Sequence, residues 1–234
     1  KQEKHIGGSY FDWASYSQGT LFEKLQTSPK GLTEKEAEKR LEIYGYNEPA
    51  KKKKHTIIYQ IILKFFNPLV VVLLVIAAFS IYFGETISAC IVSSMAVISV
   101  FLTFIQEYNA GKEAERLSEM VSATATVYRN GKKKEIAIKE IVPGDIIDLS
   151  AGDMIPADLR IIYCKDLFIN QATLTGESSP CEKMSEPVQS AKGSVAELPN
   201  TVFMGSSVVS GTALGIVIRT GLNTQFGAIS KELA

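Results

Sequence analysis

The residues best suited to chemistry form one short loop that combines a carboxylate, a glycine and two hydroxyl groups. They are Thr175, Gly176, Glu177 and Ser178. A carboxylate on such a loop can hold a water molecule and accept its proton, provided that the water comes within about 3 Å. Alone, the pattern is a weak signal, because an ordinary turn with a solvated acid has the same composition. Its meaning therefore depends on the rest of the chain.

Three aspartates offer a second candidate site, because carboxylates close together can hold a metal ion. Asp145 and Asp153 each follow a glycine, and Asp158 follows an alanine, all at predicted turns. Aspartate at such positions commonly accepts hydrogen bonds from nearby backbone N–H groups. We expect this structural role and predict no metal ligands, with a metal cluster as the alternative.

Two apolar segments dominate the first half of the chain. Residues 57–83 are strongly apolar apart from Lys64, Asn67 and Pro68, and residues 86–105 carry no charge. About 20 helical residues cross the ~30 Å hydrocarbon layer of a membrane. The sequence therefore predicts a transmembrane helical hairpin over 51–106, kinked at Asn67-Pro68. The alternative is a pair of buried helices in a soluble core.

Charges beside the hairpin predict its orientation. Only Gly84 and Glu85 separate the two apolar segments, so both far ends lie on one side of the membrane. Lys51–Lys54 flank one end, and Lys112 and Arg116 flank the other. Positive flanks favour the cytosol, and the lysine run is also suited to anionic lipid headgroups.

The remaining segments are predicted to be cytosolic. Residues 1–50 hold a short amphipathic helix over 33–44, begun by Thr33 and Glu36, and their aromatic residues are either docked or part of a loose tail. Residues 107–122 read as a stalk helix that continues the second apolar segment. Over 123–234 the pattern alternates and turns are frequent, as at Asn130-Gly131, which predicts an all-β domain of the sandwich or barrel kind.

Charge and cysteine content narrow the function classes. Lys and Arg together number 25, as do Asp and Glu, so the balance gives no indication of nucleic acid as a partner. The three cysteines, Cys90, Cys164 and Cys181, fit neither a zinc site nor a disulfide framework.

The motifs taken together, over roughly residues 20–234, resemble the cation-transporting P-type ATPases. The residues that carry the resemblance are Gly31-Leu32-Thr33, Tyr46–Pro49, Val142–Asp145, Gly152–Asp158, Asp166–Ala172 and Leu174–Ser178. The resemblance implies a multidomain membrane protein fragment, with a transmembrane helical hairpin and an all-β, distorted jelly-roll-like actuator domain with short flanking helices. It identifies the chain as the N-terminal part of a multi-pass pump of the plasma membrane.

The resemblance also implies a catalytic role for the loop. In this family an aspartate of the pump is phosphorylated by ATP, and Glu177 would hold the water that hydrolyses the acyl phosphate. Gly176 would let the backbone approach the phosphate, while Thr175 and Ser178 would bond the loop or the water, or serve only as turn residues. The sequence contains no Asp-Lys-Thr-Gly-Thr, so we expect this chain alone to be inactive and to bind no cofactor. ATP and Mg²⁺ would serve the complete enzyme.

The transported ion is predicted from the amino-acid sequences of particular segments. The segments Gln106-Glu107-Tyr108, Met120–Val127, Leu149–Asp158 and Asn200–Gly211 are similar to those of the bacterial magnesium-transporting branch. We therefore expect an ATP-driven Mg²⁺ transporter whose partners are membrane lipid, the other pump domains and the transported divalent cation, with no nucleic acid. The alternatives are a Ca²⁺ pump, or a short non-catalytic membrane protein that reuses the module.

Overall fold

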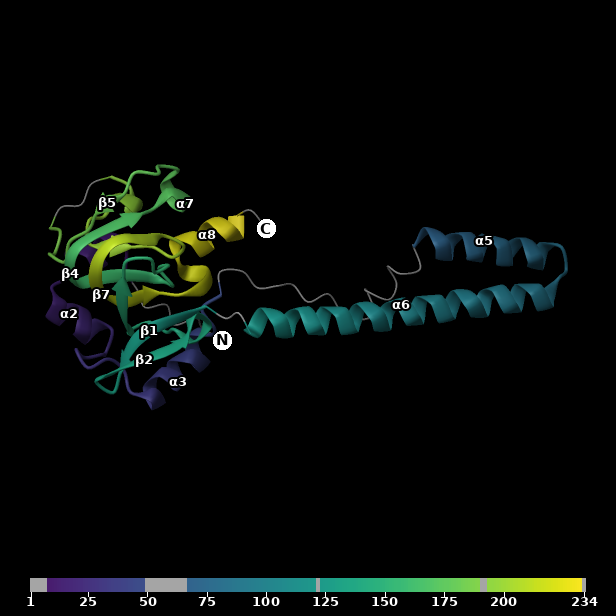
Figure 1. The fold of residues 1–234 in the computed structure, drawn as a ribbon, viewed down its shortest axis with the longest axis horizontal. Coiled ribbons are helices and arrows are strands. Elements are labelled where there is room, and N and C mark those ends of the chain that lie inside the picture. The colour runs from purple at the N-terminus through teal and green to yellow at the C-terminus, as the bar shows by residue number, and fades with distance from the viewer. Residues whose placement is uncertain (1–7, 49–66, 121–122, 190–192, 233–234) are drawn as a thin grey trace. The chain divides into compact units, whose positions relative to one another are not determined.

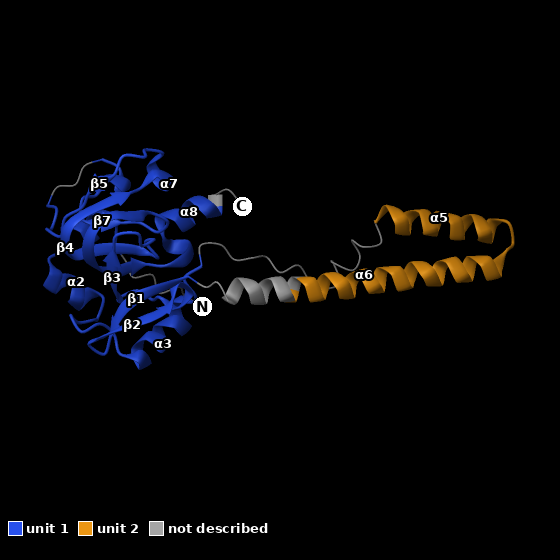
Figure 2. Ribbon diagram, in the orientation of Figure 1, with its two compact units in different colours: residues 1–51, 123–234 blue, residues 52–122 orange. Residues whose placement is uncertain are grey.

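The computed structural model describes residues 8–48, 67–120, 123–189 and 193–232. They fall into two compact units (Figure 2), one of residues 1–51 with 123–234 and one of residues 52–122. The N-terminal segment is thus part of the same unit as the β-rich region. Each unit is described by itself.

The larger unit is built on one antiparallel sheet of seven strands (Figure 1). The strands are β1 (Thr124–Arg129), β2 (Lys132–Ala137), β3 (Ile146–Ser150), β4 (Asp158–Asn170), β5 (Cys181–Glu182), β6 (Thr201–Val202) and β7 (Ser207–Arg219). Their order is β2-β1-β3-β7-β4-β5, and β6 pairs with β4 outside this path. The predicted β domain with short flanking helices is confirmed in this coarse form.

The alternating sequence pattern predicts short strands over 159–163, 167–169, 207–209 and 214–219, whereas the structure joins each pair into one long strand. β4 and β7 have 13 residues each and pair along their whole length, with bulges that bend them. At one bend Asp166 has a positive φ of 50°, and Gly211 of β7 packs so closely that a Cβ there would lie 2.2 Å from the Asp166 carbonyl oxygen. Aspartate and glycine are common in turns. The sequence pattern therefore predicts a turn where the structure has a bulge.

The helices of this unit are short. They are α1 (Tyr10–Ser15), α2 (Gln18–Lys24), α3 (Glu34–Tyr44), α7 (Ala172–Thr175) and α8 (Gln225–Glu232), with 3-10 turns η1 (Ile138–Glu140), η2 (Val195–Glu197) and η3 (Gly221–Asn223). α3 begins as predicted, with the Thr33 hydroxyl accepting a hydrogen bond from the Glu36 N–H at 3.2 Å. The Glu36 carboxylate, however, binds Arg40 at 3.0 Å instead of closing a capping box.

Apolar side chains pack on both faces of the sheet, as the alternation along β7 requires. Val217 belongs to the core formed among the strands, whereas Ile216 and Ile218 pack with the N-terminal helices. Tyr10, Trp13 and Leu21 supply the N-terminal side of that second cluster, in which Trp13 is only 1% exposed. The aromatic residues of the N-terminal region are therefore docked and do not form a loose tail.

In the described residues of the smaller unit, two antiparallel helices, α5 (Pro68–Tyr82) and α6 (Thr86–Met120), are joined at Gly84 and Glu85. Val70 of α5 packs against Ala96 and Val100 of α6. α6 continues without a break into the predicted stalk region. Among the described residues, α6 is the one helix long and apolar enough to cross a membrane, over Thr86–Ala110, whereas α5 is shorter.

Pro68 begins α5 in the described part of the chain. It occupies the first turn, and the Asn67 side chain caps the helix by accepting a hydrogen bond from the Leu69 N–H at 3.1 Å. Proline is well suited to a first turn because its missing N–H has no partner there in any case. The predicted kink within a longer helix is not seen in these residues. The part of the predicted hairpin that precedes Asn67, namely the apolar residues 57–66 with Lys64 and the Lys51–Lys54 run, lies outside the described residues.

Candidate functional site

The loop that carries Glu177 follows directly from β4. Asn170 ends the strand, and its side-chain oxygen accepts a hydrogen bond from the Ala172 N–H at 2.9 Å, which starts the single turn α7. The turn ends at Gly176, whose N–H donates to the Ala172 carbonyl at 2.9 Å. Gly176 has φ +77° and ψ −6°, the left-handed conformation that glycine adopts most readily.

The reason for a glycine at position 176 is thus conformational in this structure. A Cβ built on Gly176 would meet no atom within 4 Å. Space at the loop therefore does not require glycine, whereas the positive φ does. Position 176 therefore has a conformational reason to be glycine. The predicted reason, that glycine lets the backbone approach a phosphate, stays a prediction.

The base of the loop is anchored at three points. Gln171 is buried, and its Nε2 donates to the Ala196 carbonyl at 2.8 Å. The Thr173 hydroxyl donates to the Gly205 carbonyl at 3.1 Å. Leu174 packs against the apolar cluster beneath the N-terminal helices.

The tip of the loop is free. Glu177 and Ser178 are exposed, and in the described part of the chain neither side chain has a hydrogen bond or ion pair. Thr175 acts within the loop, because its hydroxyl donates to the Gln171 carbonyl and accepts from the Glu177 N–H, both at 3.2 Å. An exposed carboxylate on an anchored loop can reach a group outside this unit.

The three candidate aspartates do not converge. Asp145 is fully buried and forms a two-point ion pair with Arg129, at 3.0 and 2.7 Å. Asp153 accepts a hydrogen bond from the Ser150 N–H at 2.8 Å. Asp158 is fully buried and faces Tyr10. Among the described residues, no group of three or more His, Cys, Asp or Glu side chains could hold a metal ion.

Two family models match the chain. The P-type ATPase actuator domain matches residues 119–234, and the cation transporter/ATPase N-terminus matches residues 13–80. The chain belongs to the cation-transporting P-type ATPases. The β-rich unit is accordingly an actuator domain, and membership of this family agrees with the apolar α6 in placing the protein in a membrane.

Individual relatives transport two different ions. The chain is 42% identical over 220 residues to magnesium-transporting ATPase, P-type 1, of Escherichia coli (strain K12), which is 92% of this chain and 24% of that protein. Identity to the enzyme of the same name from Salmonella typhimurium (strain LT2) is 40% over 227 residues, 94% of this chain and 25% of that protein. The calcium-transporting ATPase of Bacillus subtilis (strain 168) is 36% identical over 217 residues, 92% of this chain and 24% of that protein. The chain spans about a quarter of the length of these relatives.

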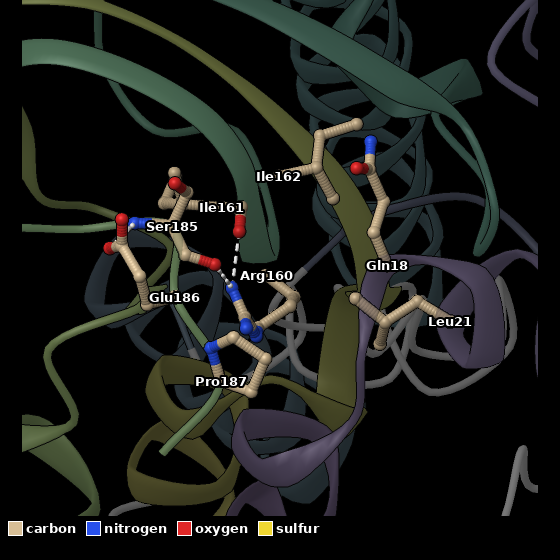
Figure 3. Close-up of a pocket in the computed structure, with 8 residues that line it drawn as sticks. All are labelled: Gln18, Leu21, Arg160, Ile161, Ile162, Ser185, Glu186 and Pro187. Atoms are coloured by element: carbon tan, nitrogen blue, oxygen red, sulfur yellow. Dashed lines mark hydrogen bonds between the residues drawn. The ribbon is translucent and has the colours of Figure 1, made fainter.

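One cavity of about 210 Å³ lies elsewhere on the actuator domain (Figure 3). It is lined by residues of α2, β4 and the segment 185–187, and by no residue of the Glu177 loop. The guanidinium of Arg160, which is 1% exposed, donates there to the Ser185 carbonyl at 3.1 Å (Figure 3). Its Nε also donates to the Trp13 carbonyl of α1 at 3.3 Å. Burial lowers the pKa of Arg160 to about 10. These bonds tie helix α1 and the segment after β5 to strand β4.

The sequence pattern does not predict the burial of two cations of the actuator domain, Arg160 and Lys183. The Lys183 ammonium donates to the Leu198 carbonyl at 2.8 Å, and burial lowers its pKa to about 8. Lysine and arginine are usually exposed, and no local pattern marks these two as exceptions. Only the three-dimensional packing reveals them.

Proposed function

We propose that this chain provides the actuator domain and the first membrane hairpin of an ATP-driven Mg²⁺ pump. The observation that carries the catalytic part is the placement of Glu177, exposed and without a partner among the described residues, at the tip of an anchored loop. The two magnesium-transporting relatives, at 42% and 40% identity, support Mg²⁺ over Ca²⁺, for which the similar calcium pump is at 36%.

Glu177 would act on an aspartyl phosphate in another domain of the pump. Its carboxylate holds a water molecule in line with the phosphorus and takes a proton from it. The water oxygen bonds to phosphorus as the bond from phosphorus to the aspartate oxygen breaks, which releases phosphate and the aspartate carboxylate. Thr175 and Gly176 hold the loop in shape, and Ser178 lies beside the water site or serves as a turn residue.

The hairpin would convert movement of the actuator domain into movement in the membrane. In this proposal α6 and a first helix that includes α5 cross the bilayer, with Glu85 outside and the exposed Lys112 on the cytosolic side. The apolar outer surfaces of both helices support contact with lipid. The same proposal includes the division of the chain into residues 1–50, 51–106, 107–122 and 123–234. It also includes a distorted jelly-roll-like form of the actuator domain.

The experiment is the substitution Glu177→Gln in the complete pump, reconstituted in lipid. The variant should still form phosphoenzyme from ATP but accumulate it, because loss of a positioned base typically costs about 10²–10⁴-fold in rate. Glu182→Gln, which alters another exposed carboxylate of the same domain, is the matched control and should behave as wild type. Unchanged phosphoenzyme levels in Glu177→Gln would refute the assigned role.

The ion is tested separately. Proteoliposomes that contain the complete pump and an ion-sensitive dye should show ATP-dependent Mg²⁺ movement in the direction that corresponds to entry into the cytosol. Movement of Ca²⁺ alone would favour the calcium alternative. A protein that forms no phosphoenzyme with either ion would indicate a non-catalytic membrane protein that reuses the module.

A further inference from the structure

Asp158 is a fully buried carboxylate that the proposed reaction does not use. It begins β4, and its side chain accepts three hydrogen bonds from segments far apart in the sequence. The Tyr10 hydroxyl and the Gln225 N–H donate to Oδ2, at 2.5 and 2.7 Å, and the Met204 N–H donates to Oδ1 at 2.9 Å. Burial raises the pKa of Asp158, while these donors and Arg219 oppose the rise.

The Met204 contact fixes a turn that supports the Glu177 loop. Phe203 and Ser206 close this turn by a backbone hydrogen bond of 3.2 Å, and the Gly205 N–H donates to the Ile155 carbonyl at 3.1 Å. The Gly205 carbonyl in turn accepts the hydroxyl of Thr173 at 3.1 Å. Asp158 holds the residue before Gly205, so its carboxylate sets where that carbonyl lies.

Thr173 transfers this placement to the catalytic loop. It lies in the single turn α7, which ends at Gly176. A helical turn of this length has too few hydrogen bonds of its own to be stable without tertiary support. Its position therefore depends on its anchors, of which the Thr173 contact is the one linked to Asp158.

We propose that Asp158 is a positioning residue for dephosphorylation, acting through the Phe203–Ser206 turn and Thr173 to place Glu177. The inference rests on the proposed function of Glu177. Asp158 itself is buried and does not touch the reacting atoms. The same carboxylate also holds the first residue of α8 and the N-terminal helix α1, so the loop, α1 and α8 share one buried anchor.

Asp158→Asn tests this with little change in volume. Both carboxylate oxygens accept backbone N–H groups, so an amide must turn its own N–H₂ toward either Met204 or Gln225. At least one backbone hydrogen bond is then lost. In the complete pump, hydrogen exchange of the peptide covering residues 172–178 should rise roughly fivefold or more, and phosphoenzyme decay should slow by a similar factor with its formation unchanged.

The matched control is Asp145→Asn. It alters a second fully buried aspartate of the same domain, whose partners Arg129 and Val142 do not belong to the loop or its supporting turn. It should lower stability but leave exchange over 172–178 and phosphoenzyme decay at wild-type values. Equal effects of the two variants on exchange and decay would overturn the proposal, because they would reflect general loosening of the domain.

Substitutions of the exposed Thr173 test the same path without changing a buried residue. Thr173→Val removes the exposed hydroxyl that binds Gly205, and Thr173→Ser retains it. The valine variant should slow decay and the serine variant should not, and the effects of Thr173→Val and Asp158→Asn should be less than additive. Additive effects, or normal decay in Thr173→Val, would overturn the path. If the phosphoenzyme of Glu177→Gln decays at the normal rate, the proposed function fails. Hydrogen exchange over residues 172–178 still decides whether Asp158 positions the loop.

Discussion

Replacing Gly176 with alanine should slow dephosphorylation about 5- to 30-fold. Gly176 has φ +77°, and an alanine in this left-handed conformation costs about 1–2 kcal/mol. No atom lies within 4 Å of the added Cβ, so this backbone cost is the whole penalty. The exposed loop can avoid it by rotating to negative φ, which moves the Glu177 N–H away from Thr175. The population with the original geometry then falls by the factor that corresponds to 1–2 kcal/mol.

The assay is the decay of phosphoenzyme in the complete pump after a chase with unlabelled ATP. Gly152→Ala is the control, because Gly152 also has a positive φ, +96°, and also leaves its Cβ in open space, in a different turn of the same domain. The two variants should lose similar stability, but only the phosphoenzyme of Gly176→Ala should decay slowly. Gly176→Asn should recover part of the rate, since asparagine tolerates the left-handed region better than alanine.

Two outcomes would refute this reasoning. Decay at the wild-type rate in Gly176→Ala would mean that the left-handed residue does not control the placement of Glu177. Equal slowing in Gly152→Ala would mean that decay reports the stability of the domain and not the geometry of the loop.

Two further predictions concern the stability of this chain, measured by urea unfolding in detergent with its single tryptophan, the buried Trp13, as the fluorescent probe. Asp145→Asn should lower the free energy of unfolding by about 3–5 kcal/mol, because it leaves Arg129 buried without its main counter-charge, and a loss below about 1 kcal/mol would contradict the ion pair's role. Burial lowers the pKa of Lys183 from 10.5 to about 8, so between these values the unfolded state binds more protons and stability rises with pH. Wild type should gain about 2 kcal/mol from pH 7.5 to 9.5 relative to Lys183→Met, and parallel pH profiles would contradict this.

The parts of the fold that could be predicted have local causes. α3 begins at Thr33 because its hydroxyl binds the backbone three residues later, and Asn130-Gly131 turns β1 into β2 with positive φ at both residues. The bend of β4 at Asp166 has a distant cause, since the strand continues there only because β7 pairs with it. A positive φ in the middle of a strand has the same local signature as a turn.

The candidate site divides in the same way. Glu177 could be predicted as a candidate because its motif is contiguous in the sequence, and the structure places it on an exposed loop. Asp158 was interpreted as a local cap, because its partners Tyr10, Met204 and Gln225 lie 148, 46 and 67 residues away. For a similar reason, the sequence could not decide whether Trp13 is docked. Its burial depends on segments that lie about 190–200 residues further along the chain.

The most direct test of the account is the lifetime of phosphoenzyme in Glu177→Gln, measured in a single turnover at saturating ATP. The account predicts normal formation followed by decay slower than wild type by about 10²-fold or more. Decay within a factor of two of wild type, in a protein that still forms phosphoenzyme, would contradict it.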